Sequence, residues 1–331
     1  MSLDSKTPKM SLKLLILTLV SPVFATNLRR PHCPNSILSC SSASQSPLLN
    51  TCCTETLGGL VLSTQFWSTY TGLESAGQLL PANSWTLHSL WPDFCNGSYT
   101  QYCDLNRQYD PRPSPNTTTG KPDGIPVPPY SGPTVDTFLS ALSKPGKTLL
   151  KWMNEFWIAQ GQPNTELWAH EFSKHATCFG TFAQGCFSER ELKLHDDMLD
   201  YFDVSARFFA RLPTYDWLAE KGITPRNSTG YSLREIQAAL EEKHGGPPFV
   251  GCAGPRWNET EAGKGSGDAG RTVLSEVWYY YHVYGRVQEG RGKEVGADVN
   301  GGSVSSCAKA EGAVWYYERT KGSEGRSQGP T

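Results

Sequence analysis

The distribution of apolar and polar residues along the chain predicts several strands. Residues 58–67 form a short apolar run bounded by glycines, which is typical of a buried strand. Residues 85–91 alternate between apolar and polar positions, so His88 is expected on the polar face near the end of a strand. Pro92 is expected to end that strand. Two later segments rich in β-branched and aromatic side chains also predict strands: residues 272–284 and residues 313–317.

Helical periodicity recurs in the middle of the chain. It predicts helices over residues 138–158, 166–178, 189–212 and 232–244. The first of these is expected to be interrupted around Pro145 and Gly146, and the last to begin with a capping box formed by Ser232 and Glu235. Strands and helices do not alternate in a regular βαβ order, and no internal repeat is present. The pattern therefore predicts a single α+β domain in which an antiparallel sheet packs with helices.

The predicted helix 166–178 carries an unusual group of ionisable side chains. At about 3.6 residues per turn, one face holds His170, Glu171, Lys174 and His175, while small or apolar residues occupy the opposite face. The alternative is an ordinary amphipathic surface helix, whose polar face normally mixes Glu, Lys and Gln. Two of the seven histidines of the chain lie on this one face, which favours a functional site.

A zinc site is the first chemistry to test on this helix. His170 and Glu171 resemble the start of the H-E-x-x-H motif, whose second histidine lies four residues after the first. Here that position holds Lys174, and an ammonium group between two ligands opposes a divalent metal. Neither a glycine-rich phosphate loop nor a serine nucleophile elbow is apparent. We therefore predict no metal and no cofactor.

The N-terminus has the features of a secretory signal. Lysines precede the apolar run 14–20, and small residues before residue 26 suit cleavage, so residues 1–25 are predicted to be a signal peptide. The run is too short to span a bilayer, and we expect no membrane association after cleavage. The chain is thus predicted to be secreted or vacuolar. Residues 26–320 would form the domain, and residues 321–331 a polar, disordered tail.

Composition agrees with export. The chain has ten cysteines, an even number that permits five disulfides in an oxidising compartment, although spacing alone leaves their pairing open. Glycosylation is predicted at four Asn-x-Ser/Thr sequons: Asn96, Asn116, Asn227 and Asn258. The proline-rich segment 107–133 is expected to be a surface loop. The net charge of −2 gives no bulk attraction for a polyanion, so such a substrate needs a local cationic patch.

Two histidines from separate segments suggest the reaction. His88 at a strand end and His175 on the helix can act as acid and base near or below neutral pH. Lys174 and a protonated His170 can stabilise the anion that develops when phosphorus becomes pentacoordinate. These residues predict phosphoryl transfer without a cofactor.

At this point two segments are recognisable. Residues 85–93 (WTLHSLWPD) and 168–178 (WAHEFSKHATC) closely resemble the two active-site segments of the T2 family of ribonucleases. The ten cysteines and residues 64–67 (TQFW) extend the resemblance to about residues 33–320. It implies a disulfide-rich α+β fold and a secreted, acid-active endoribonuclease. The enzyme would be a monomer that cleaves single-stranded RNA, and not DNA, with low base specificity.

The resemblance also implies a role for each residue. His175 would take the proton from the ribose 2′-OH and His88 would protonate the leaving 5′-oxygen. His170 would hold the phosphate, while Glu171 and Lys174 would stabilise the pentacoordinate state. The products would be a 2′,3′-cyclic phosphate and then a 3′-phosphate. Substrate-binding positions implied by the matching segments are Trp91, Asp93, Tyr99 and Gln65. The implied disulfides are Cys33–Cys53, Cys40–Cys95, Cys52–Cys186, Cys103–Cys178 and Cys252–Cys307.

Two positions depart from the family pattern. Ser89 and Ala176 each stand where the family usually has glycine after a catalytic histidine. Ala176 is expected on the buried side of the helix, where a methyl group is tolerated. Ser89 would be strained if its backbone required a positive φ.

Other readings of the chain remain. A secreted protein that keeps the fold but only binds ligands would be expected to lack His88 or His175, and this chain has both. An acid hydrolase of other phosphate esters is a further alternative, against which the base-binding residues argue. Trp91, Asp93 and Tyr99 could also be ordinary core or turn residues.

Overall fold

The computed structural model describes residues 33, 36–187, 195–254 and 271–325. The predicted signal peptide, the sequon at Asn258 and the start of the predicted helix 189–212 lie outside these residues. The helices are α1 Val135–Ala141, α2 Ser143–Phe156, α3 Asn164–Lys174, α4 Asp196–Phe209, α5 Thr214–Ala219 and α6 Leu233–His244. The strands are β1 Leu60–Phe66, β2 Leu80–Pro81, β3 Thr86–Asp93, β4 Phe249–Ala253, β5 Thr272–Val283, β6 Gly292–Val295, β7 Val314–Trp315 and β8 Glu324–Gly325.

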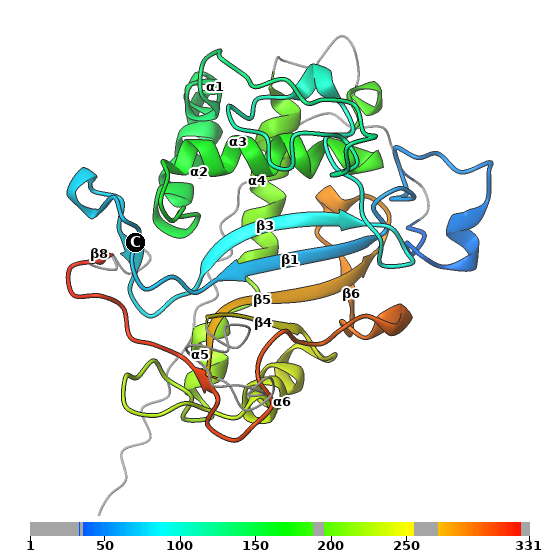
Figure 1. The fold of residues 1–331 in the computed structure, drawn as a ribbon. Helices are drawn as coiled ribbons and strands as arrows, with labels where there is room; N and C mark the ends of the chain where they lie inside the picture. Colours follow the sequence, from blue (N-terminus) through cyan, green and yellow to red (C-terminus); the bar gives the residue numbers. More distant parts are fainter. Residues whose placement is uncertain (1–32, 34–35, 188–194, 255–270, 326–331) are drawn as a thin grey trace, which may run out of the picture.

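A six-stranded sheet organises the described part of the chain. Its central order is β3-β1-β5-β4, all antiparallel, and β6 and β7 add to β5, with β7 parallel to it. Figure 1 shows α1, α2 and α3 beyond the β3 edge, α4 behind the sheet, and α5 and α6 on the β4 side. This mixture of helices and a mainly antiparallel sheet confirms the predicted α+β class. No helix among the described residues has the length and apolar character needed to cross a bilayer.

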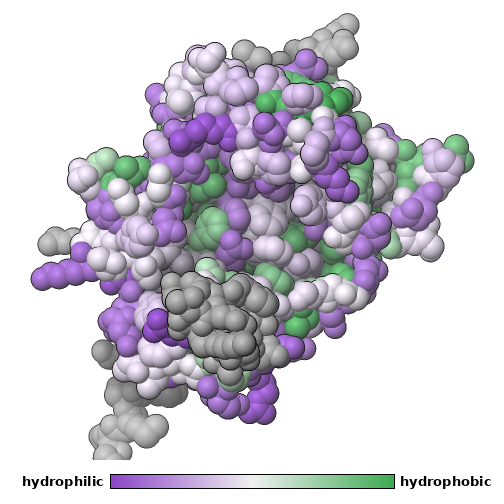
Figure 2. Space-filling view, in the orientation of Figure 1, coloured by the Kyte–Doolittle hydropathy of each residue, from purple (hydrophilic) through white to green (hydrophobic). Residues whose placement is uncertain are grey.

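The two faces of the sheet differ in what covers them. The helices pack on one face and bury a large core that includes Val61, Leu87 and Val277. The opposite face carries a smaller apolar cluster around Leu60 and Leu62, with several aromatic rings that are only partly buried. Figure 2 shows this second face, which is hollowed at its centre and mixes apolar with polar side chains. We call it the open face.

Several predicted elements have different limits in the structure. β3 continues through Pro92, which pairs with Val61, because β3 is an edge strand and loses no sheet hydrogen bond there. The helix predicted over residues 138–158 breaks at Leu142, not at Pro145, because proline is accommodated in the first turn of α2. The strand predicted over residues 313–317 is reduced to β7.

The C-terminal segment is ordered further than expected. Residues 321–325 were predicted to belong to a disordered tail, but β8 pairs with β2 in a small second sheet. The hydroxyl of Ser323 donates to Glu74 at 2.9 Å, and the backbone amide of Leu80 donates to the carbonyl of Ser323 at 2.8 Å. The prediction of disorder is wrong for these residues, because polar side chains here find partners within the fold.

Other local predictions are confirmed. α6 begins at the reciprocal capping box of Ser232 and Glu235, and β5 covers the predicted strand to within one residue. The described residues form five disulfides, which join the same pairs that the family resemblance implied. Asn96, Asn116 and Asn227 are exposed, and their glycosylation stays a prediction.

Candidate active site

The two predicted catalytic histidines meet above the β3 edge of the sheet. His88 lies in β3 opposite an irregularity in the pairing with β1, between Thr64 and Gln65. His175 directly follows α3, where the helix gives way to a 3-10 turn over Ala176–Cys178. The Cys103–Cys178 disulfide fixes this end of α3. Segments 87 residues apart in the chain therefore place two imidazoles at one site.

Glu171 lies between the two imidazoles. Its Oε1 is 3.4 Å from His88 Nε2, and its Oε2 is 3.6 Å from His175 Nε2. The residue is 1% exposed. Burial raises the pKa of Glu171, but the nearby His88, His175 and His170 outweigh burial and hold the pKa well below its usual range. The carboxylate is therefore ionised and can balance a positive charge on either histidine.

Aromatic rings fix the orientation of both histidines. The ring of His88 stacks on Phe66 at 3.7 Å between centroids, and that of His175 stacks on Trp91 at 5.1 Å. The indole N–H of Trp91 donates to Glu171 Oε2 at 3.1 Å. The indole N–H of Trp157 donates to the backbone carbonyl of His88 at 2.8 Å.

Burial also affects the protonation of His175. It lowers the pKa of His175 well below the ordinary value, although the charge of Glu171 opposes the shift. Burial therefore favours the neutral imidazole of His175, which is the form that accepts a proton.

A second histidine cluster lies one turn earlier on α3. His170 Nδ1 is 2.7 Å from Asp110 Oδ2, and the hydroxyl of Tyr102 donates to the same oxygen at 2.9 Å. Burial and the charge of Asp110 raise the pKa of Tyr102, so its hydroxyl remains a donor. Tyr102 adopts a positive φ of 49°, which is strained for a bulky residue, and its amide donates to the carbonyl of Lys174. The carboxylate of Asp110 thus orients the imidazole of His170.

Lys174 lies beside this cluster. Its ammonium donates to the backbone carbonyl of Ser114 at 3.2 Å, in the loop that follows Asp110. Burial lowers the pKa of Lys174, while the charges of Glu171 and Asp110 oppose the shift. The four residues predicted on one face of the helix therefore lie together in the structure, with acidic partners around them.

The predicted base-binding residues Trp91, Asp93 and Tyr99 are also neighbours. Asp93 and Tyr99 form an antiparallel bridge, so the chain turns back on itself after β3. Tyr99 is 67% exposed, and Trp91 is half-buried on the open face. Burial raises the pKa of Asp93 to about 7. An aromatic ring, an exposed phenol and a carboxyl that is protonated below neutral pH can all contact a nucleobase.

Gln65 does not belong to this group. Its side chain is fully buried on the helix-covered face, where it donates to the carbonyl of Leu212 at 2.9 Å and accepts from Thr214 at 2.7 Å. Alternation along β1 explains this position, because Phe66 faces the open side. The prediction that Gln65 binds substrate is therefore wrong.

The two departures from the family pattern are accommodated. Ser89 is not among the described residues with a positive φ, and its hydroxyl hydrogen-bonds to that of Tyr201 at 2.7 Å. Ala176 is completely buried, as the helical pattern predicted. Neither side chain intrudes on the histidines.

Sequence reasoning missed the residues that support the site. Asp110 lies in the proline-rich segment 107–133, whose composition indicates only an exposed loop, and Tyr102 lies before that segment, where no periodic pattern distinguishes it. Phe66 was noted only as part of a motif. Three or more His, Cys, Asp or Glu side chains do not come together in a metal-binding arrangement anywhere in the described residues.

Comparisons with known proteins agree with this geometry. A family model described as "Ribonuclease T2 family" matches residues 58–293. The chain is 32% identical over 274 residues to Ribonuclease Le2 of Lentinula edodes, a match that covers 82% of this chain and 92% of that protein. It is 33% identical over 276 residues to Ribonuclease Trv of Hypocrea rufa, covering 83% and 94%.

Other relatives are longer, and a solved structure has a similar fold. The match to Ribonuclease T2-like 1-A of Candida albicans, 33% identical over 275 residues, covers 83% of this chain but 56% of that protein. The chain thus spans little more than half the length of some curated relatives. The crystal structure of Actibind, described as one of the T2 ribonucleases, is 27% identical with a TM-score of 0.64, and the match covers 89% of this chain and 100% of that one.

Proposed function

This chain belongs to the ribonuclease T2 family, and we propose that it is a metal-independent endoribonuclease that cleaves single-stranded RNA by transphosphorylation. The observation that carries the proposal is the buried carboxylate of Glu171, which contacts one imidazole through each oxygen. RNA supplies its own nucleophile in the 2′-OH, so the protein has only to move protons and stabilise charge.

In the first step His175 accepts the proton of the ribose 2′-OH, since burial keeps this imidazole neutral. The 2′-oxygen attacks phosphorus, and His88 gives a proton to the departing 5′-oxygen of the next nucleotide. The positive charge passes from His88 to His175, and Glu171 contacts both, so its carboxylate compensates the charge before and after the step.

The phosphate carries the negative charge that develops during attack. His170 and Lys174 lie one helical turn apart on the same side of α3 and supply donors for the non-bridging oxygens. Asp110 and Tyr102 hold the imidazole of His170 in one orientation, so little reorganisation accompanies binding. These contacts would strengthen as the phosphorus becomes pentacoordinate.

The second step reverses the two roles. His88, now neutral, takes a proton from water, the resulting hydroxide equivalent attacks the 2′,3′-cyclic phosphate, and His175 returns a proton to the 2′-oxygen. The product is a 3′-phosphate, and the histidines regain their starting protonation states.

Trp91, Asp93 and Tyr99 would bind the base on the 5′ side of the cut. Stacking on an aromatic ring accepts any base, which gives low base specificity. The protonated form of Asp93 can donate to a ring nitrogen, and its ionised form can only accept. We further propose that the protein is secreted and glycosylated, which its five disulfides and exposed sequons support, and that it acts as a monomer.

Kinetics of the two histidine variants test the proposal. His88→Ala and His175→Ala should each lower kcat on a dinucleoside monophosphate by about 10²–10⁴-fold. His282→Ala is the matched control, because this half-buried histidine lies on the same sheet in β5 and has no assigned role. Wild-type kcat in either active-site variant would refute the two-histidine mechanism. It would favour a protein that hydrolyses another phosphate ester or one that only binds ligands.

A further inference from the structure

The indole of Trp91 contacts all three groups that take part in proton transfer. Its N–H donates to Glu171 Oε2 at 3.1 Å. Its ring stacks on the imidazole of His175 at 5.1 Å between centroids, and it meets the imidazole of His88 edge-to-face at 4.8 Å. A residue that only binds a base needs none of these contacts, so Trp91 has a second task at this site.

The two carboxylate oxygens of Glu171 are used unequally. Oε1 lies 3.4 Å from His88 Nε2. Oε2 lies 3.6 Å from His175 Nε2 and also accepts the indole N–H of Trp91. A donated hydrogen bond stabilises the charge of the oxygen that accepts it, and that oxygen then attracts a further proton less strongly. Oε2 is therefore a weaker partner for a proton on His175 than Oε1 is for a proton on His88.

The groups around His175 shift its pKa in different directions. Burial lowers the pKa, and the charges of Lys174, His170 and His88 also lower it. The charge of Glu171 raises it. The strength with which Oε2 of Glu171 attracts a proton therefore affects how readily His175 stays neutral.

We propose that Trp91 is a positioning residue for proton transfer, which holds Glu171 between the two histidines and favours the proton on His88 over the proton on His175. The inference rests on the proposed ribonuclease function, in which His175 must be neutral and His88 protonated at the start of the reaction. Contact of Trp91 with the base is then only part of its contribution to the rate.

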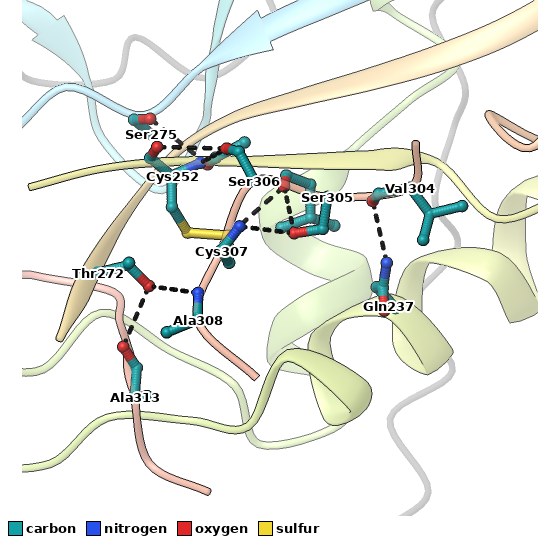
Figure 3. The surroundings of a disulfide bond; sticks show 12 residues. Gln237, Cys252, Thr272, Ser275, Val304, Ser305, Ser306, Cys307, Ala308 and Ala313 are labelled. Carbon is teal, nitrogen blue, oxygen red and sulfur yellow. Dashed lines mark hydrogen bonds between the residues drawn. A yellow bond between two sulfur atoms is a disulfide. The ribbon is translucent and has the colours of Figure 1, made fainter. Parts of the chain in front are cut away.

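Trp278 provides a matched control for the indole hydrogen bond. It is half-buried in β5, and its indole N–H donates to Glu276 Oε2 at 2.7 Å. The neighbouring strand β4 is anchored by the Cys252–Cys307 disulfide, as Figure 3 shows. Trp278 also meets Trp91 edge-to-face at 5.2 Å. Trp278→Phe therefore removes the same kind of bond, and some packing beside the site, without changing a contact of Glu171.

Two substrates separate the proposed role of Trp91 from contact with the base. One is a dinucleoside monophosphate, and the other has the same cleavable phosphodiester but lacks the base on its 5′ side. Trp91→Phe keeps an aromatic ring for stacking and removes the indole N–H. Tyr99→Leu removes a ring that is assigned only to base binding. Single-turnover kinetics with excess enzyme measure even slow cleavage of the abasic substrate.

Trp91→Phe should slow cleavage about 10-fold to 100-fold on both substrates, the size of a hydrogen bond to a charged group. On the dinucleoside monophosphate, the acidic limb of its kcat/KM profile should move to higher pH, because Oε2 then attracts a proton to His175 more strongly. Tyr99→Leu should slow cleavage of the substrate with both bases only. Trp278→Phe should change neither the rates nor the profile, and thermal melting checks that each variant is folded.

A loss that is confined to the substrate with both bases, or an acidic limb that does not move, would overturn the inference. Wild-type kinetics in Trp91→Phe would overturn it while leaving the proposed function intact. A wild-type chain that cleaves neither substrate would overturn the proposed function and the inference together. If wild type cleaves only the dinucleoside monophosphate, the position of the acidic limb on that substrate decides.

The NMR resonances of the indole N–H groups give a second measurement, which needs no change at Trp91. Glu171→Gln removes the charge that accepts the indole hydrogen bond, so it should shift the resonance of Trp91 and leave that of Trp278 in place. An unshifted Trp91 resonance would show that the hydrogen bond to Glu171 does not form, and the inference would be wrong.

Discussion

Replacing Asp110 by Asn tests how the phosphate is held. Asp110 is 2% exposed, and its Oδ2 contacts both His170 Nδ1 at 2.7 Å and the hydroxyl of Tyr102 at 2.9 Å. Asparagine has nearly the same shape, so the loop should keep its path, but the negative charge is lost. The amide can also turn its NH₂ group toward the imidazole of His170. The imidazole N–H then has no acceptor, and the ring of His170 is no longer held in one orientation.

The size of the effect follows from the kind of bond that is lost. A hydrogen bond to a charged group contributes about 1.5–3 kcal/mol, which corresponds to about 10-fold to 100-fold in kcat/KM. Because His170 is assigned to phosphate binding, much of the loss should fall on KM. The double variant Asp110→Asn with His170→Ala should be no worse than His170→Ala alone, since Asp110 acts through that imidazole.

Steady-state kinetics on a dinucleoside monophosphate, with thermal melting as a check on folding, measure these effects. Asp123→Asn is the matched control, because it removes an exposed carboxylate from the same loop and should change neither constant. Additive losses in the double variant would show that Asp110 does not act through His170. A lower melting temperature with unchanged kcat and KM would show that Asp110 only stabilises the fold.

Three further predictions concern pH, packing and the nucleophile. Because the pKa of Asp93 is raised in the folded protein, its contribution to stability is present below about pH 4 and is lost as pH rises to about 7. In urea unfolding, Asp93→Asn should therefore stabilise the protein more at pH 8 than at pH 4. An equal effect at both pH values would contradict the raised pKa. Ser89→Gly should cost about 1 kcal/mol of stability, because the buried hydrogen bond to Tyr201 is lost; a higher melting temperature would show that Ser89 is strained after all. Excess chelator should leave RNA cleavage unchanged. Neither DNA nor RNA that is methylated at every 2′-oxygen should be cut. Loss of activity with chelator, or cleavage of DNA, would indicate that a metal-activated water attacks phosphorus.

Local patterns were sufficient for the elements that carry the site. The helical period placed His170, Glu171 and Lys174 on one side of α3, with His175 directly after its last residue, and the alternation of residues 85–91 placed His88 on the open face. Both signals depend only on neighbouring residues, so they can be read without knowing the fold. The direct contacts of Glu171 with two histidines could not be derived this way, because the register between α3 and β3 is set by packing.

Contacts made by irregular segments had no such signal. Asp110 reaches His170 across 60 residues of sequence, from a loop whose proline content indicates only the lack of regular structure. β8 is two residues long, too short for any period. Gln65 differs from these residues, because a local pattern does describe its position. Alternation along β1 places Gln65 and Phe66 on opposite faces of the sheet, so Gln65 is excluded from substrate binding once the open face is known to hold the site.

The most direct test of the central claim is the identity of the first product formed from RNA. In water enriched in ¹⁸O, a single turnover on a dinucleoside monophosphate should release a 2′,3′-cyclic phosphate that contains no ¹⁸O, because the 2′-OH and not water attacks phosphorus. The label should enter only when the cyclic phosphate is hydrolysed to the 3′-phosphate. A first product that already contains ¹⁸O, or one that carries its phosphate on the 5′-oxygen, would contradict the mechanism.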